Sequence, residues 1–174
     1  MTDREPVEAV DLDIYGSGKL PWSTAHDRLA NDLTKPEVPL FLNTVRPDGR
    51  PHSAAVGAYW LDGDLYFTSG PKTRKSRNLA ANPACTISVR LPGVDLVLEG
   101  EAARTLDPDT LSRVAAGYRE NGWPAEVDGD ALTAPYSAQS AGPPPWYLYR
   151  FTFHTAFGVA TEEPFGATRW RFAR

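Results

Sequence analysis

The sequence predicts a mainly β protein: a closed or partly closed antiparallel barrel with helices on its periphery. Short segments of alternating apolar and polar residues recur along the chain, and only three segments have the apolar spacing of an amphipathic helix. The chain also holds 14 glycines and 16 prolines, which favour many turns over a helical bundle. Its 174 residues suit one domain, which we expect over residues 21–174 after an irregular N-terminal arm, residues 1–20.

The first half of the domain is predicted to hold one helix and three strands. The helix begins at Pro21-Trp22, with Ser23 or Thr24 as its cap, and ends before Pro36. Its apolar stripe is Trp22, Ala25, Leu29 and Leu33. Strands follow over residues 38–45, 51–59 and 65–69, joined by tight turns at Pro47-Asp48-Gly49 and Asp62-Gly63.

The second half is predicted to hold two helices and three or four strands. A short helix spans 76–81, and strands cover 84–90 and 95–105. A helix from Asp107 to about Glu120 has Asp107 as its N-cap and Pro108 at its first position. Residues 121–145 are predicted to be a long surface loop, and strands return over 146–160 and in the tail, 167–172.

Composition excludes several classes of protein. The net charge of −4 disfavours nucleic-acid binding, which needs a basic face. No segment of about 18 apolar residues predicts a membrane span, and the N-terminus has no signal-peptide pattern. The single cysteine, Cys85, excludes an intrachain disulfide, and no metal-ligand spacing is present. We therefore expect a cytoplasmic protein that binds neither nucleic acid nor membrane nor metal.

The strongest local signal is the basic segment that follows the third strand. Lys72, Arg74, Lys75 and Arg77 lie within six positions and lead into a predicted helix. Arg and Lys side chains, with backbone N–H groups at a helix start, are the donors that phosphate prefers. Thr68-Ser69 at the strand end and Ser76 and Asn78 in the helix add polar donors. The pattern predicts an anion site, although an ordinary solvated basic face remains the alternative.

A second signal is the strand at 53–58, which consists mostly of small residues. Ser53, Ala54, Ala55 and Gly57 are unusual in a strand, where β-branched and aromatic residues prevail. Small residues permit close approach, either of a flat ring or of another backbone. Cys85 and the three histidines fit structural roles better than catalytic ones. A chain with an anion site and no evident catalytic side chain suggests that a cofactor carries the chemistry.

Four segments together resemble a known family. They are TVRPDGRPH at 44–52, LYFTS at 65–69, RKSRNLAANP at 74–83 and LEGEA at 98–102, supported by Pro21-Trp22 and by TRWRF at 168–172. The sequence resembles the pyridoxamine 5′-phosphate oxidase-like split-barrel proteins over residues 20–172, and in particular their flavin and deazaflavin oxidoreductase branch. The resemblance implies a six-stranded antiparallel split β-barrel, a homodimer, and a cofactor in a groove at the dimer interface.

The resemblance also implies roles for individual residues. The ring of the cofactor would rest on the strand segment Ser53, Ala54, Ala55 and Val56, and His52 beside it is a further predicted cofactor-binding residue. The strand-end pair Phe67 and Thr68 would line the ribityl chain, and the adjacent Ser69 is a further predicted cofactor-binding residue. Arg74 and Lys75 would hold the phosphate, helped by Ser76, Arg77 and Asn78, with Lys72 nearby.

Two departures argue against pyridoxamine phosphate oxidation itself. The tail reads Arg169-Trp170-Arg171, without the histidine with which the authentic oxidase holds its substrate. Asp95 stands where that enzyme offers a glutamine to the flavin. The cofactor is FMN or coenzyme F-420; Lys72 and Arg77 suit the acidic tail of F-420, which we favour.

The sequence thus predicts an oxidoreductase that transfers a hydride between the cofactor and a small, mostly apolar acceptor. The loop at 121–145, with Trp123, Tyr136 and Trp146, would cover the substrate side. Two alternatives remain: a flavin-binding carrier or sensor without turnover, and a haem-handling split barrel with His52 or His154 as its ligand.

Overall fold

The computed structural model describes residues 4–139 and 141–173 as a β-rich fold with three helices in these ranges. Residues 1–3 of the predicted arm, Ser140 of the predicted loop and Arg174 at the end of the predicted domain lie outside the described residues. The elements in chain order are β1 (Glu8–Asp11), α1 (Trp22–Asp32), β2 (Leu40–Val45), β3 (Pro51–Ala55), β4 (Ala58–Leu61), β5 (Asp64–Ser69), α2 (Arg74–Ala81), β6 (Ala84–Leu91), β7 (Val94–Arg104), α3 (Pro108–Glu120), β8 (Glu126–Asp128), β9 (Ala131–Thr133), β10 (Tyr147–Ala160) and β11 (Ala167–Arg171).

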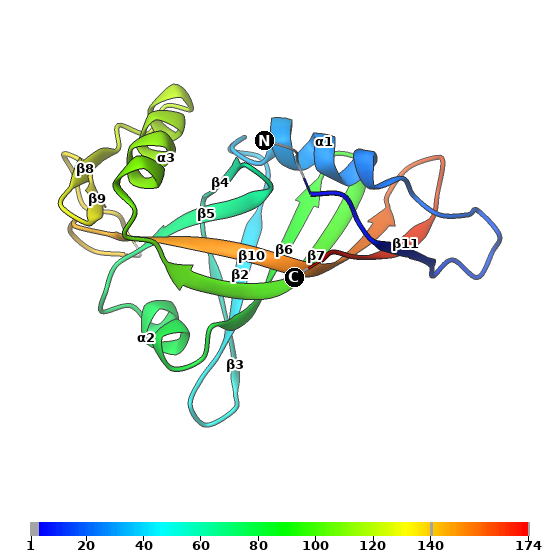
Figure 1. Cartoon of the computed structure of the whole chain (residues 1–174), viewed down its shortest axis with the longest axis horizontal. Helices are drawn as coiled ribbons and strands as arrows, with labels where there is room; N and C mark the ends of the chain where they lie inside the picture. The colour runs from blue at the N-terminus through cyan, green and yellow to red at the C-terminus, as the bar shows by residue number, and fades with distance from the viewer. Residues whose placement is uncertain (1–3, 140, 174) are drawn as a thin grey trace.

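The long strand β10 joins the two parts of the main antiparallel sheet (Figure 1). It pairs with β7 from Tyr149 to Ala160, with β5 through Tyr147–Phe151, and with β11 through Thr155–Val159. From β7 the sheet continues through β6 and β2 to β3. Because β10 changes its second partner midway, the sheet folds around a core as a split barrel, which confirms the predicted fold class.

The bend in β10 requires a glycine on the neighbouring strand. The pairing of β7 with β10 shifts register between Phe153 and Thr155, as at a β-bulge. Gly100 faces this shift, and a Cβ atom there would lie 2.2 Å from the carbonyl oxygen of Thr152 and 2.7 Å from the Cα of Phe153. The two backbones therefore approach each other more closely than any other residue at this position would permit.

Helix α1 covers one opening of the barrel with the apolar stripe predicted from its spacing. Trp22, Ala25, Leu29 and Leu33 are all buried. The indole of Trp22 makes an edge-to-face contact with Trp170, at 5.4 Å between ring centroids. The helix begins at Trp22 as predicted, but the cap prediction was wrong, because the N-cap is Pro21, two residues before Ser23, and no side chain makes a cap hydrogen bond. The start of the helix is thus fixed by the burial of Trp22 and not by a capping hydroxyl group.

Helix α3 packs on the outside of β5 and β10 and forms a second, smaller core. The Asp107 side chain accepts a hydrogen bond from the Thr110 backbone N–H at 2.9 Å, which confirms the predicted cap. Leu111, Val114 and Tyr118 are buried on the inner face of this helix. The Tyr118 hydroxyl donates to the carbonyl oxygen of Tyr66, at 3.0 Å, and so fixes the helix to β5.

Three sequence predictions need correction. Within the arm predicted as irregular, Glu8–Asp11 forms β1, which pairs with the free edge of β11. Its side chains are all exposed or half-buried, so no alternation marks it. The loop at 121–145 contains a hairpin, β8 and β9, whose three-residue strands are too short to show a period. The strand predicted over 51–59 divides at Val56-Gly57, because β3 pairs with β2 whereas β4 pairs with β5.

Among the described residues, no helix has both the length and the apolar character to cross a lipid bilayer.

Candidate functional site

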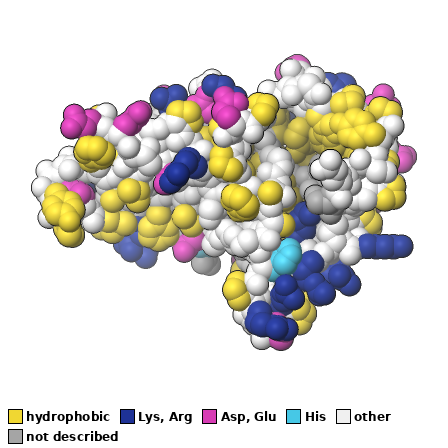
Figure 2. Space-filling model, turned by 180° about the vertical axis from the view of Figure 1, so that it is seen from behind, with side chains coloured by type: hydrophobic (Ala, Val, Ile, Leu, Met, Phe, Trp, Pro, Cys, Tyr) yellow, Lys and Arg dark blue, Asp and Glu magenta, His cyan; other side chains and the backbone are white. Residues whose placement is uncertain are grey.

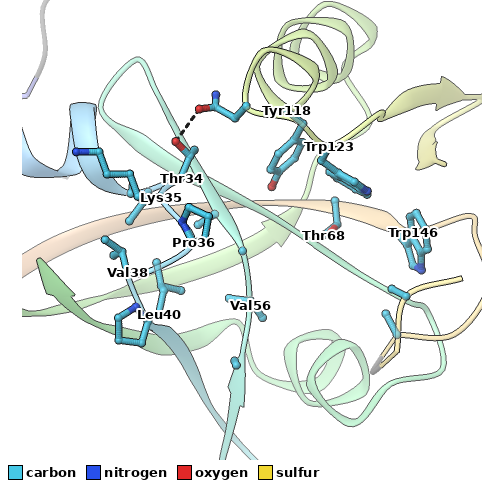
Figure 3. Close-up of a pocket in the computed structure, with 18 of the residues that line it drawn as sticks. Thr34, Lys35, Pro36, Val38, Leu40, Val56, Thr68, Tyr118, Trp123 and Trp146 are labelled. Atoms are coloured by element: carbon cyan, nitrogen blue, oxygen red, sulfur yellow. Dashed lines mark hydrogen bonds between the residues drawn. The ribbon is translucent and has the colours of Figure 1, made fainter. Parts of the chain in front are cut away.

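Two cavities adjoin each other where β3 ends and α2 begins. The large cavity, about 560 Å³, lies between the segment Ala55–Ala58, the connection from α1 to β2, and the end of α3 (Figure 3). The small cavity, about 410 Å³, lies between β3 and the start of α2. Ala55 and Lys75 line both, so one buried cation serves the two spaces.

Lys75 is the central charge of this site. It lies on the inner face of α2, where its side chain is only 6% exposed. Within residues 4–139 and 141–173, neither a carboxylate nor a hydrogen-bond acceptor pairs with its ammonium group. Burial lowers the pKa of the Lys75 amine, because the charged form loses its hydration. Most of the Lys75 side chain is thus buried while its ammonium group, without a carboxylate partner among the described residues, lies at the junction of the two cavities, which makes it a candidate group for holding an anion.

The loop before α2 is held in shape by three hydroxyl groups. The Ser69 hydroxyl lies 2.8 Å from that of Thr73 and 2.7 Å from that of Ser76. Thr73 is also the N-cap of α2, since its side chain accepts a hydrogen bond from the Ser76 backbone N–H. The Asn78 amide donates to Thr44 on β2 at 2.9 Å. Ser69, Ser76 and Asn78, all predicted to bind cofactor, therefore brace the loop and helix through their side chains.

Basic side chains surround the small cavity. Arg74 lines it together with His52, and Lys and Arg gather over the projecting part of the molecule that carries the β2–β3 hairpin and α2 (Figure 2). Burial lowers the pKa of His52, and the charges of Arg46, Lys75 and Arg74 lower it further. The lowered pKa favours the neutral imidazole, and its Nδ1 is buried without a hydrogen-bond partner in the described part of the chain.

This setting predicts a pH dependence for anion binding. A bound phosphate would oppose the neighbouring cations and raise the pKa of His52, so binding would be accompanied by proton uptake. We expect the affinity of wild type for a phosphate-bearing cofactor to rise, relative to His52→Gln, as the pH falls from about 7.5 to 5.5. Titration calorimetry of both proteins across this pH range measures the two affinities. Parallel pH profiles for wild type and His52→Gln would contradict the assignment of His52 to the phosphate site.

The small-residue strand forms one wall of both cavities. Ala54 lines the small cavity, Val56 and Gly57 line the large one, and Ala55 lines both. Ser53 points elsewhere, and its hydroxyl donates to the Asn43 side-chain oxygen at 2.7 Å. Three of the four residues predicted to support the ring, Ala54–Val56, thus face the cavities, as does His52, which was predicted to bind the cofactor.

The remaining predicted residues divide into two groups. Thr68 lines the large cavity, whereas the ring of Phe67 is fully buried in the core and stacks on Tyr149 at 5.3 Å. Phe67 can therefore offer a ligand only its backbone. Lys72 and Arg77 are exposed and lie outside the residues that line the cavities. The structure thus brings Arg74, Lys75 and Thr68 together with β3, but not Lys72, Arg77 or the Phe67 ring.

Sequence reasoning missed a further part of the large cavity. The connection between α1 and β2 contributes Thr34, Lys35, Pro36 and Val38, and its position has no local signature in the sequence. Trp123 and Trp146, expected over the substrate side, do line the cavity, whereas Tyr136 is exposed outside its lining. Tyr118 also faces the cavity, although its helical spacing predicted only a core role.

Cys85 and Asp95 lie outside the lining of both cavities. Burial raises the pKa of the Cys85 thiol to about 12, so the group stays protonated, in agreement with the predicted core role. Asp95 pairs with Arg90 at 2.7 Å, and this contact holds the pKa of the Asp95 carboxyl below its usual value. Asp95 is therefore an ion-pair partner of the neighbouring strand β6, close to the β6–β7 turn.

The fold and the site together define a split-barrel protein with a cationic cleft between β3 and α2. The sequence model of the pyridoxamine 5′-phosphate oxidase family matches residues 29–160. Because this match covers most of the chain, the chain belongs to the pyridoxamine 5′-phosphate oxidase family. A search of curated protein sequences finds no match.

Solved structures share the fold at low sequence identity. A pyridoxamine 5′-phosphate oxidase-related, FMN-binding protein from Nostoc punctiforme is 20% identical, with a TM-score of 0.55, over 87% of this chain and 91% of that one. A NimC/NimA family protein from Clostridium acetobutylicum is 18% identical, with a TM-score of 0.55, over 83% and 93%. A haem-binding protein from Mycobacterium smegmatis is 15% identical, with a TM-score of 0.53, over 80% and 56%. These likenesses establish the split-barrel fold.

Proposed function

We propose that this protein is a flavin- or deazaflavin-dependent oxidoreductase that transfers a hydride between a bound cofactor and a small, mostly apolar acceptor. The observation that carries the proposal is Lys75, a largely buried residue whose unpaired ammonium group lies between two cavities. In this proposal the small cavity takes the phosphate, through Arg74 and Lys75, and the ring lies against Ala55–Gly57. The cofactor supplies the redox chemistry, and the chain supplies placement and charge.

The exposed cations favour coenzyme F-420 over FMN. Lys72 and Arg77 lie beyond the small cavity, and neither has a carboxylate partner in the part of the chain that the structure describes. FMN ends at its phosphate and leaves these two charges unused. The acidic tail of F-420 extends past the phosphate and would meet them.

Parallel titration of the purified protein with FMN, F-420 and haem tests the proposal. We expect saturable binding of F-420 or FMN, and no Soret band with haem. Assays with the reduced cofactor and a panel of enones, quinones and tetrapyrroles then separate an enzyme from a carrier, which would reduce none of them. Failure of both FMN and F-420 to bind would refute the proposed function.

A second copy of the chain is the proposed partner, since an exposed row of side chains crosses the sheet from the cofactor strand. Ala55 is paired with Phe41, Phe41 with Ser88, and Ser88 with Val97. Directly paired residues share one face of a sheet. Phe41 is 45% exposed and Val97 is 39% exposed, so two large apolar side chains of this row are uncovered in the single chain, with the half-buried Ser88 between them. A partner on this face would also lie beside the ring site.

Phe41→Glu should therefore convert a dimer into a monomer, because it places a charge in the centre of the proposed contact. Sedimentation equilibrium measures the mass, and Val127→Glu, on an exposed residue of β8 far from this row in sequence and sheet, serves as the control. An unchanged mass in Phe41→Glu, or a monomeric wild type, would contradict the dimer surface.

A further inference from the structure

Three aromatic side chains form the wall of the large cavity that faces the small-residue segment. Tyr118, Trp123 and Trp146 line this wall, with Val56 opposite them (Figure 3). Tyr118 and Trp146 are almost fully buried, whereas Trp123 is only partly buried. Of the three side chains, Trp123 is therefore the one whose ring still has accessible surface that a ligand could contact.

The wall presents mostly aromatic ring surface to the cavity. Trp123 packs edge-to-face on Tyr118, at 4.7 Å and 78°, and lies 5.7 Å from Trp146. The Tyr118 hydroxyl is used by Tyr66 and the Trp146 indole N–H donates to the Gly142 carbonyl oxygen at 3.3 Å. With these polar atoms bonded elsewhere, the wall offers ring surface held in a fixed position, which favours stacking of a flat molecule.

The charges around the cavity select against cations. Among the described residues that line it there is no Asp or Glu. Its two cations are Lys35, which is paired with Asp32, and Lys75, which is unpaired. A positively charged ligand would enter this space without a counterion and would be repelled by Lys75.

We infer that Trp123 is the stacking platform for the substrate, and that the substrate is a planar aromatic molecule without a positive charge. The inference rests on the proposed function, which places the cofactor ring against Ala55–Gly57 and so leaves the aromatic wall for the second reactant. A flat acceptor between the ring and Trp123 would meet the face of the cofactor, as hydride transfer requires. Trp123 determines specificity in this arrangement and takes no chemical part.

Three bicyclic probes of matched shape test the inference: naphthalene-2-carboxamide, 2-naphthoate and the 2-naphthylmethylammonium ion. Each probe is titrated by calorimetry into two forms of the protein. One is the cofactor-free protein, and the other is the protein saturated with FMN or F-420, whichever of the two cofactors the protein binds. We expect the amide and the carboxylate to bind, and the ammonium ion to bind about tenfold more weakly or not at all. Trp123→Leu, which keeps apolar volume but removes the ring, should weaken the amide about tenfold.

Two further variants make the test specific. Trp123→Phe retains an aromatic face and should stay within about threefold of wild type. Tyr136→Ala removes an exposed aromatic residue from the same segment, outside the cavity lining, and should change nothing. Melting curves of each variant confirm that the fold is retained.

The outcomes separate this inference from the proposed function. If FMN or F-420 binds but the probes do not, or if the ammonium ion binds as well as the amide, the inference is overturned and the proposed function stands. Equal affinity in wild type and Trp123→Leu overturns it as well. If neither cofactor binds but the probes bind in a Trp123-dependent way, the proposed function fails and the aromatic platform is supported.

Discussion

Replacing Arg74 and Lys75 together by Ala should weaken binding of the phosphate-bearing cofactor by at least about 100-fold. Each charge-assisted hydrogen bond to a phosphate contributes about 1.5–3 kcal/mol, and the variant removes two cations that line the small cavity. The loop should keep its shape, because the hydroxyl contacts of Ser69, Thr73 and Ser76 involve neither side chain. Fluorescence titration with FMN and with F-420 measures the loss.

The matched control removes two cations from the same segment. Lys72→Ala/Arg77→Ala changes the net charge equally but leaves the small cavity intact. It should leave FMN affinity within about threefold, and weaken F-420 more if the acidic tail meets these residues. Equal losses of FMN affinity in the two double variants would show general attraction to a basic surface instead of a phosphate site.

Gly100→Ala should lower the free energy of unfolding by about 3 kcal/mol, at the upper end of the range for overpacked cores. The added Cβ would lie 2.2 Å from the Thr152 carbonyl oxygen, and this neighbour is backbone that cannot rotate away. Relief requires β7 and β10 to separate where the register shifts, next to the fully buried ring of Phe153. For a domain of this size the melting temperature should fall by about 10 °C.

Gly57→Ala is the control for this prediction. No atom lies within 4 Å of the position that its Cβ would occupy, and its φ is not in the left-handed region. Alanine there should be neutral or slightly stabilising, because it restricts the unfolded chain. If both variants melt at the same temperature, the close approach of the two backbones at Gly100 is not important for stability.

The sequence predicts the elements of this fold better than their partners. Alternation placed most strands within a few residues, and the stripe of α1 and the Asp107 cap of α3 were confirmed. Alternation does not say which strand a segment will join, so the division of residues 51–59 between two pairings was not predictable. The edge strand β1 was missed because its burial does not alternate, and its partner lies about 160 residues away in the chain.

The candidate site was predictable where local chemistry marks it. Charge density revealed Arg74 and Lys75, and small residues revealed Ala54–Gly57. Which member of the basic segment is buried depends on the face that α2 turns inward, so Lys72 and Arg77 could not be separated from Lys75 by sequence alone. The cavity wall from Thr34 to Val38 exists only because a connection between two elements passes the end of α3.

The three hydroxyl groups at the start of α2 have a consequence for how the cleft meets its ligand. Neutral contacts of this kind are not screened by dissolved ions, unlike the attraction between a cation and a phosphate. Concentrated salt should thus weaken the attraction of the proposed phosphate-bearing cofactor, while the loop between β5 and α2 keeps its shape. The proposed attraction of the cofactor and the shape of its loop would therefore depend on different contacts, so ionic strength should change the first and leave the second.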